Sequence, residues 1–61
     1  MEIRYALHRW DEMPEEEHDL IKSVAQRFAY DWGYEHHLEY YWIRFTDENY
    51  LLAQLALGGR N

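Results

Sequence analysis

Hydrophobic and polar positions alternate over the first stretch of the chain, EIRYALHRW, residues 2–10. Ile3, Tyr5 and Leu7 fall on one side of an extended segment, and the residues between them fall on the other. Alternation with a period of two is typical of a strand that buries one face. We therefore predict a strand over residues 2–10.

The spacing of hydrophobic residues changes after Pro14. Proline suits the first turn of a helix because it has no backbone N–H to leave unpaired. Three glutamates follow, where a helix dipole favours negative charge. Apolar residues then recur at helical spacing and form one stripe, made of Leu20, Ile21, Val24, Ala25, Phe28 and Trp32. Gly33 stands where a left-handed residue would end the helix. The pattern predicts a helix over residues 14–32.

Two more apolar segments follow, residues 36–46 and 50–57, and we predict both as strands of a hairpin. A loop of residues 47–48 would pair Phe45 with Tyr50 and leave both faces mixed. A loop of residues 47–49 would instead pair Thr46 with Tyr50, and its asparagine suits the left-handed position of such a turn. The second register separates the faces, so we prefer it.

In that register one face of the hairpin is apolar throughout and forms the core with the helix. It carries Tyr41, Ile43, Phe45, Leu51, Ala53, Leu55 and Leu57. The other face carries Tyr40, Trp42, Arg44, Tyr50 and Leu52. No predicted element remains to cover this second face.

The expected fold is a single α+β domain over residues 1–61, with the order β-α-β-β and a tail at 58–61. Residues 50–57 form the most apolar strand, so we place this third strand in the centre of the sheet. The strand order is then 1-3-2, every pair is antiparallel, and the one helix packs on one face.

The uncovered face is the clearest functional signal in the sequence. Exposed apolar patches mark interfaces, and Tyr, Trp and Arg are enriched among binding hot spots. We therefore predict a partner-binding face made of Tyr40, Trp42, Arg44, Tyr50 and Leu52. The alternative is that the register is wrong and these rings belong to the core.

A chain of 61 residues without cysteine buries only about 60% of the surface that its unfolded form exposes. Disulfides cannot support so small a core, so a partner chain is the expected support, and we expect a homo-oligomer, most simply a dimer. No apolar run approaches the ~20 residues of a membrane span, and residues 1–10 do not read as a signal peptide. We expect no membrane association and a cytoplasmic location.

Twelve acidic and six basic residues give a net charge of −6, which disfavours direct binding to nucleic acid. Six carboxylates lie close together in an acidic run made of Asp11, Glu12, Glu15, Glu16, Glu17 and Asp19. The run is either a solvated helix start or a second partner-binding patch for a basic protein surface.

The four histidines, His8, His18, His36 and His37, lack the spacing of a zinc site. On a strand, neighbours 36 and 37 would point to opposite faces, so we expect ordinary surface histidines, no metal and no cofactor. The chain has no glycine-rich phosphate loop and no nucleophile motif. We therefore expect no enzymatic activity.

In size, charge and aromatic content the chain resembles the very small acidic proteins that phages make against host enzymes, anti-CRISPR proteins among them. The resemblance implies a non-enzymatic inhibitor or modulator that sterically blocks a larger nucleic-acid-handling protein, in the host cytoplasm if a phage encodes it. Two alternatives stay open, a structural homodimerising domain and a histidine–carboxylate metal-binding protein.

Overall fold

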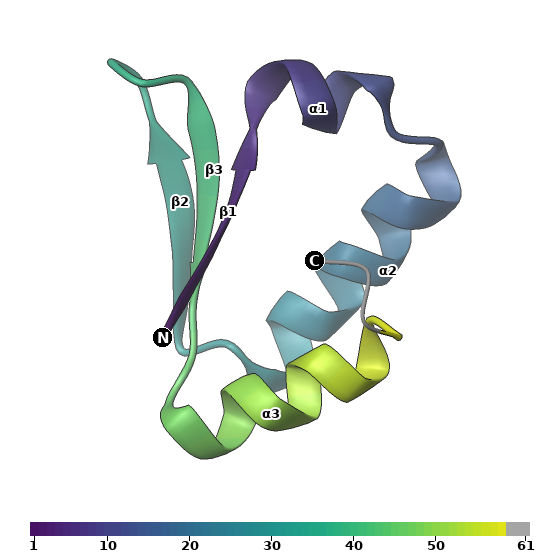
Figure 1. The fold of residues 1–61 in the computed structure, drawn as a ribbon, viewed down its shortest axis with the longest axis vertical. Coiled ribbons are helices and arrows are strands. Elements are labelled where there is room, and N and C mark those ends of the chain that lie inside the picture. Colours follow the sequence, from purple (N-terminus) through teal and green to yellow (C-terminus); the bar gives the residue numbers. More distant parts are fainter. Residues whose placement is uncertain (59–61) are drawn as a thin grey trace.

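The computed structural model describes residues 1–58 and shows an α+β domain with a three-stranded antiparallel sheet and helices (Figure 1). The elements in chain order are β1 (Glu2–Ala6), α1 (Leu7–Glu12), α2 (Glu15–Phe28), β2 (Asp31–Glu35), β3 (Tyr40–Arg44) and α3 (Asp47–Ala56). Strand β3 lies between β1 and β2 and is antiparallel to both. The predicted class and the strand order 1-3-2 are confirmed, although the central strand is not the predicted segment.

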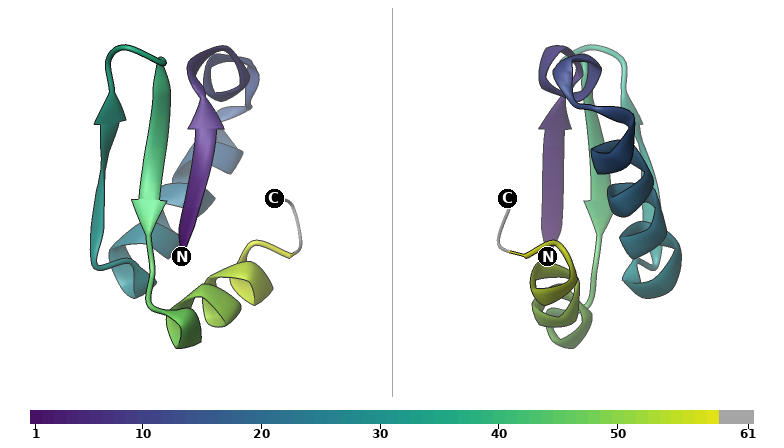
Figure 2. Two further views of the ribbon diagram at one scale, coloured as in Figure 1. Left: turned by 60° about the vertical axis from the view of Figure 1, so that its left-hand side comes forward. Right: turned by 90° about the vertical axis from the view of Figure 1, so that its right-hand side faces the viewer.

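The helices lie on one side and at both ends of the sheet, with α1 at the end where β1 finishes (Figures 1 and 2). Helix α2 runs along one face, and α3 crosses the end at which β3 finishes and β1 begins (Figures 1 and 2). We call the face toward α2 the inner face; strand alternation and register give it Ile3, Tyr5, Trp32, Tyr34, Tyr41 and Ile43. The other face, which we call the outer face, has no element packed on it within residues 1–58 (Figure 2).

The core fills the space between the inner face, α2 and α3. Its buried members are Ile3, Tyr5, Ile21, Val24, Ala25, Ile43, Phe45, Ala53 and Leu57. Phe45 and Ala53 are the most completely enclosed, at 1% and 0% exposure. Ile43 and Phe45 thus belong to the core, as the sequence predicts, and half-buried Tyr41 packs against it.

The predicted first strand is too long. Strand β1 ends at Ala6, and the next six residues form α1 instead. Leu7, Arg9 and Glu12 are all good or acceptable helix formers, and no β-branched residue lies in this segment to favour a strand.

The predicted helix 14–32 is also too long. Helix α2 ends at Phe28, and Ala29 is already extended at φ −78° and ψ 146°. Residues 31–35 then form strand β2. Gly33 therefore caps no helix; it lies inside β2, opposite Trp42 of β3.

The predicted hairpin of strands 36–46 and 50–57 is wrong in both registers. Strand β3 covers only residues 40–44, and its hairpin partner is β2. Residues 36–39 form the connecting loop, in which Glu39 has a positive φ of 53°.

Residues 47–56 form helix α3 instead of a turn and a strand. Thr46 is its N-cap, and the Thr46 Oγ1 accepts a hydrogen bond from the Asn49 amide at 3.3 Å. The helix ends at a left-handed glycine, Gly58, with φ 65°. The expected tail 58–61 lies outside the described residues apart from Gly58.

Candidate functional site

Three residues of the predicted aromatic face do lie together. Tyr40, Trp42 and Arg44 point to the outer face of the sheet, because they alternate with the inward residues of β3. Strand β1 adds Glu2 and Arg4 to the same face, directly opposite Arg44 and Trp42.

The charged and aromatic side chains of the outer face contact one another. The Arg44 guanidinium lies 4.3 Å from the centre of the Trp42 ring, and the Arg4 guanidinium lies 4.8 Å from the centre of the Tyr40 ring. Glu2 links the two arginines: it accepts a hydrogen bond from Arg44 Nε at 3.0 Å and another from Arg4 Nε. These bonds hold the pKa of the Glu2 carboxyl below its ordinary value. The face is therefore a linked polar and aromatic surface whose rings are half-buried, not an open apolar patch.

The other two predicted members of this face, Tyr50 and Leu52, are not on the sheet. Both belong to α3. Tyr50 is half-buried against the core, with its ring centre 6.2 Å from that of Phe45. Leu52 points away from the core and is 44% exposed.

An exposed apolar patch does exist, on α3. Leu51, Leu52 and Leu55 are 67%, 44% and 78% exposed, and we call them the leucine patch. They are contiguous because side chains three or four residues apart are neighbours on a helix surface. Helix α3 turns Tyr50, Ala53 and Leu57 to the core, at positions i, i+3 and i+7, and leaves the leucine patch without a partner in residues 1–58.

Sequence reasoning missed the leucine patch because a strand over 50–57 would bury Leu51 and Leu55. Two signals could have revealed it. Thr46 followed by Asp47 and Glu48 is a helix-start signal, an N-cap residue before an acidic first turn, and the segment is rich in leucine and alanine, which favour helices, without one β-branched residue.

The acidic run lies at the corner where α1 meets α2 (Figure 1). Five of its six carboxylates are exposed and Glu17 is half-buried. This corner is on the helical side of the sheet, so the acidic run is not continuous with the outer face that carries Trp42. The two predicted partner-binding patches are therefore separate.

Two of the histidines take part in a chain of aromatic contacts. His18 stacks on Trp10 with ring centres 4.1 Å apart, and its Nε2 donates a hydrogen bond to the Trp10 carbonyl oxygen. That carbonyl can only accept, so Nε2 carries the hydrogen. The ring centres of Trp10 and Tyr41 are 5.1 Å apart. The Tyr34 ring centre lies 4.9 Å from that of Tyr41 and 5.0 Å from that of His36, so Tyr34 links the two.

The structure gives the histidines no common metal site. Neighbours His36 and His37 lie in the loop between β2 and β3, not on a strand. Within residues 1–58, no three His, Asp or Glu side chains are grouped so that they could hold a metal ion.

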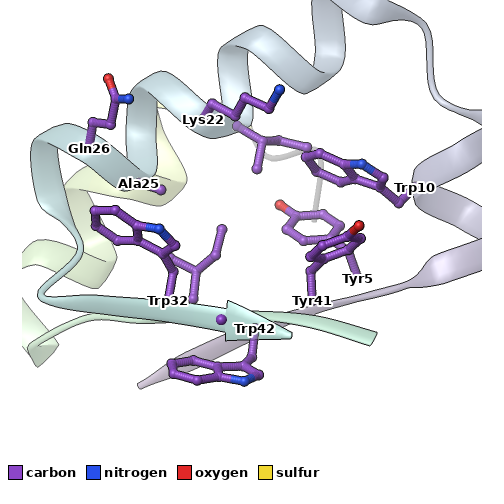
Figure 3. Close-up of a pocket in the computed structure, with 11 residues that line it drawn as sticks. Tyr5, Trp10, Lys22, Ala25, Gln26, Trp32, Tyr41 and Trp42 are labelled. Atoms are coloured by element: carbon purple, nitrogen blue, oxygen red, sulfur yellow. The ribbon is translucent and has the colours of Figure 1, made fainter. Parts of the chain in front are cut away.

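A slot of about 330 Å³ lies between α2 and the inner face of the sheet (Figure 3). Trp32 stands at one end of the slot, and Trp10 with Tyr41 stands at the other. Helix α2 completes the lining with apolar residues and with the polar side chains of Lys22 and Gln26. Trp32 is 55% exposed, because α2 covers the β2 edge of the sheet incompletely. The slot is thus mostly apolar and reaches solvent at Trp32.

Comparison of the chain with protein-family models, with curated proteins and with solved structures finds no match. Among the described residues, no helix combines the length and the apolar character needed to cross a membrane. Function is therefore inferred from the surfaces, the slot and the charges of the chain itself.

Proposed function

We propose that this protein is a small, non-enzymatic interaction module that docks on a larger protein through the leucine patch of α3. The mode is a helix laid into an apolar groove of the partner, with leucines as anchors. The observation that carries the proposal is the exposure of Leu51, Leu52 and Leu55 on one continuous helix surface.

The leucine patch does little for the protein's own fold. A leucine that passes from full exposure to full burial contributes about 1.5–3 kcal/mol, and these three leave much of that contribution unused. Exposed apolar clusters also promote aggregation, so a patch on so small a protein favours an interface as its explanation.

The charges around the leucine patch indicate what kind of surface the partner has. Asp47 and Glu48 occupy the first turn of α3, and α3 contains no lysine or arginine. Glu48 lies three and four residues before Leu51 and Leu52, so it borders the patch directly. The fitting partner has an apolar groove with a basic rim, and a basic surface is the electrostatic feature expected of a nucleic-acid-handling protein.

The proposed effect is that of an inhibitor or modulator by steric occlusion. The molecule measures 29 × 24 × 16 Å, so a bound copy would cover a groove of similar length. The acidic run is at a different place on the molecule and would reach basic residues only on a partner that extends around α1 and α2.

A homodimer through the leucine patch is the competing occupant. Two copies would bring two first turns with Asp47 and Glu48 and two net charges of −6 toward one another, which opposes self-association at low salt. The charges therefore favour a different, basic protein.

The test compares the natural protein with three variants as bait in the cell that naturally makes it, followed by direct titration of the purified partner. Leu55→Glu places a charge in the patch. Leu38→Glu is the matched control, because Leu38 is 72% exposed at the tip of the β2–β3 loop and the substitution is the same. Trp42→Ala tests the outer face.

A partner that binds the natural protein and Leu38→Glu, loses affinity at least tenfold for Leu55→Glu, and weakens with rising salt supports the proposal. Equal binding by Leu55→Glu and the natural protein overturns it, and loss only in Trp42→Ala moves the interface to the outer face. Native mass spectrometry runs in parallel: a dimer that Leu55→Glu dissociates would make the homodimer the function instead.

A further inference from the structure

Strand β2 forms one edge of the sheet, because β3 is its neighbour on one side and no strand of residues 1–58 lies on the other. It contains no lysine and no proline, two residues that commonly keep a second strand from pairing with an exposed edge. Helix α3, which carries the leucine patch, runs from the end of β3 away from β2 (Figure 2). An inference about this edge therefore does not depend on the proposed docking of α3.

Backbone groups of β2 point outward along this edge. The Phe45 amide donates to the Met1 carbonyl oxygen at 2.8 Å, and the Met1 amino group donates to the Phe45 carbonyl oxygen at 2.9 Å. Because bonding sides alternate along an antiparallel strand, the odd-numbered residues of this segment bond to β1 and the even-numbered ones are turned to β2. Their partners in β2 are Asp31, Gly33 and Glu35. The N–H and C=O groups of Trp32 and Tyr34 therefore face the free edge.

The Trp32 amide has only a local partner. It donates to Asp31 Oδ1 at 3.0 Å, an exposed bond to the preceding side chain. The carbonyl oxygen of an added strand can replace this bond at little cost. The replacement also releases the Asp31 carboxylate to bind a cation on the added strand.

The side chains of β2 give the edge an aromatic side and an acidic side. Trp32 and Tyr34 point to the inner face, and Trp32 is 55% exposed where the slot beneath α2 reaches solvent (Figure 3). Asp31 and Glu35 point to the outer face, on either side of Gly33. In a strand paired with β2, alternate residues would lie against aromatic rings on the inner side and against carboxylates on the outer side.

A second copy of the protein fits this edge poorly. Two β2 strands paired antiparallel about Gly33 would place Asp31 of each copy opposite Glu35 of the other, and like charges directly opposite each other are destabilising. The net charge of −6 on each copy adds to the repulsion. The charges therefore favour a basic segment of a different protein.

We propose that the free edge of β2 binds an extended segment of another protein as an added antiparallel strand. Its apolar residues would face the two aromatic side chains of β2, and its basic residues would face the two carboxylates. In this binding mode the main-chain hydrogen bonds supply affinity and the alternating side chains supply specificity. A short peptide that makes only these contacts reaches a dissociation constant on the order of 0.1–1 mM.

The test uses the peptide acetyl-Ser-Arg-Val-Lys-Val-Arg-Ser-amide, whose valines would lie opposite Trp32 and Tyr34. It is titrated into the ¹⁵N-labelled natural protein, and amide hydrogen exchange is measured by NMR with and without it. The amides of Trp32 and Tyr34 should exchange several-fold more slowly with the peptide, whereas that of Gly33, already turned to β3, should change little. A peptide with glutamine in place of arginine and lysine should bind roughly three- to tenfold more weakly.

Peptide controls separate strand pairing from simple charge attraction. Methyl groups on the two valine nitrogens remove the donors that face β2, so they should abolish binding. A methyl group on the lysine nitrogen, which faces away from β2, should preserve it. The permuted peptide acetyl-Ser-Val-Val-Lys-Arg-Arg-Ser-amide keeps the composition and the charge but loses the alternation, and it should bind at least several-fold more weakly.

Variants of the protein isolate the two carboxylates. Asp31→Asn combined with Glu35→Gln keeps both side-chain acceptors of the local hydrogen bonds and should remove the preference for the basic peptide over the neutral one. Asp47→Asn combined with Glu48→Gln makes the same charge change on α3 and should keep that preference.

Several results would overturn the inference. These are unchanged exchange at Trp32 and Tyr34 up to several millimolar peptide, equal binding of the permuted peptide, and valine methylation without effect. Slower exchange at these two amides on raising the protein concentration without peptide would show that a second copy pairs with β2, which also overturns it.

Discussion

Trp42 lies against Gly33 of the neighbouring strand so closely that a Cβ atom at position 33 would come within 2.5 Å of Trp42 Cζ2. The two residues are directly opposite each other in the β2–β3 ladder. Because Gly33 has no side chain, the Trp42 indole can pack directly against its backbone on the outer face, and the Arg44 guanidinium lies over the indole ring.

Gly33→Ala should destabilise the protein by about 1 kcal/mol. The new methyl group forces the indole outward, which is overpacking. The cost stays at the low end because the ring is only half-buried and can swing toward solvent. Urea denaturation measures the change.

A double-mutant cycle with Trp42→Ala is the control. Without the indole there is nothing for the methyl group to displace, and alanine suits a strand better than glycine. Gly33→Ala in the Trp42→Ala background should therefore be neutral or stabilising. An equal penalty in both backgrounds would show that the Gly33–Trp42 contact is not the cause.

Asn49→Ala should cost about 1 kcal/mol and loosen α3. The Asn49 side-chain amide donates to the Phe28 carbonyl oxygen at 3.1 Å, and Phe28 is the last residue of α2. The substitution removes this tie and leaves the carbonyl short of a partner. Gln54→Ala is the control on the same helix and should stay within about 0.5 kcal/mol. Hydrogen exchange should accelerate in α3 more than in the sheet; equal protection in both would contradict a local role for Asn49.

The residues that β1 and α2 turn to the core could be predicted from the sequence, because the periods of strands and helices are short-range signals. Ile3 and Tyr5 alternate in β1, and Ile21, Val24 and Ala25 fall on one side of α2; all five are buried. Tyr40, Trp42 and Arg44 also lie on one face as predicted, because alternation holds in β3 whichever strand is its neighbour.

The pairing of β3 could not be read in the same way. Trp32 extends the apolar spacing of α2 by one more helical step, so it reads as a helix residue, and Gly33 after it reads as a cap. Only the tertiary contact with Trp42 shows why a glycine is needed in a strand at that position. The sequence pattern therefore does not identify residues 31–35 as a strand, and it pairs β3 with residues 50–57 instead of β2.

Helix α3 differs, because its local helix signals are present in the sequence but compete with a strand pattern. Thr46 caps a helix as well as it enters a turn, and an apolar run of this length fits a buried strand or a helix equally. The consequence for function was large, since it moved Tyr50 from the binding face toward the core and brought Leu51 and Leu55 to the surface.

Glu39→Asn should stabilise the protein by about 0.5–1 kcal/mol. Glu39 holds a left-handed φ of 53° at the end of the β2–β3 loop, which costs most residues about 1–2 kcal/mol and asparagine less. The Glu39 carbonyl oxygen accepts a hydrogen bond from the Leu7 amide at 2.9 Å, and the substitution keeps this backbone bond. Thermal unfolding compares the stability of Glu39→Asn with that of Glu39→Val, whose branched side chain should raise the energy of the left-handed conformation. A lower stability for Glu39→Asn than for the natural protein would contradict strain at this position.

Glu2 should make the protein's stability fall in acid. Its hydrogen bonds to Arg4 and Arg44 lower the pKa of the folded carboxyl below the ordinary 4.5, so the unfolded chain takes up this proton first as the pH drops. The stabilisation from Glu2 is therefore present above about pH 4.5 and is lost as the pH falls through the folded pKa. Glu2→Gln should be less stable than the natural protein at pH 7, and the difference should shrink toward zero well below pH 4.5. An NMR titration of the side-chain carboxyl measures the pKa directly. Arg44→Gln should move the midpoint upward, and a Glu2 midpoint at or above 4.5 in the natural protein would show that the arginines do not hold it.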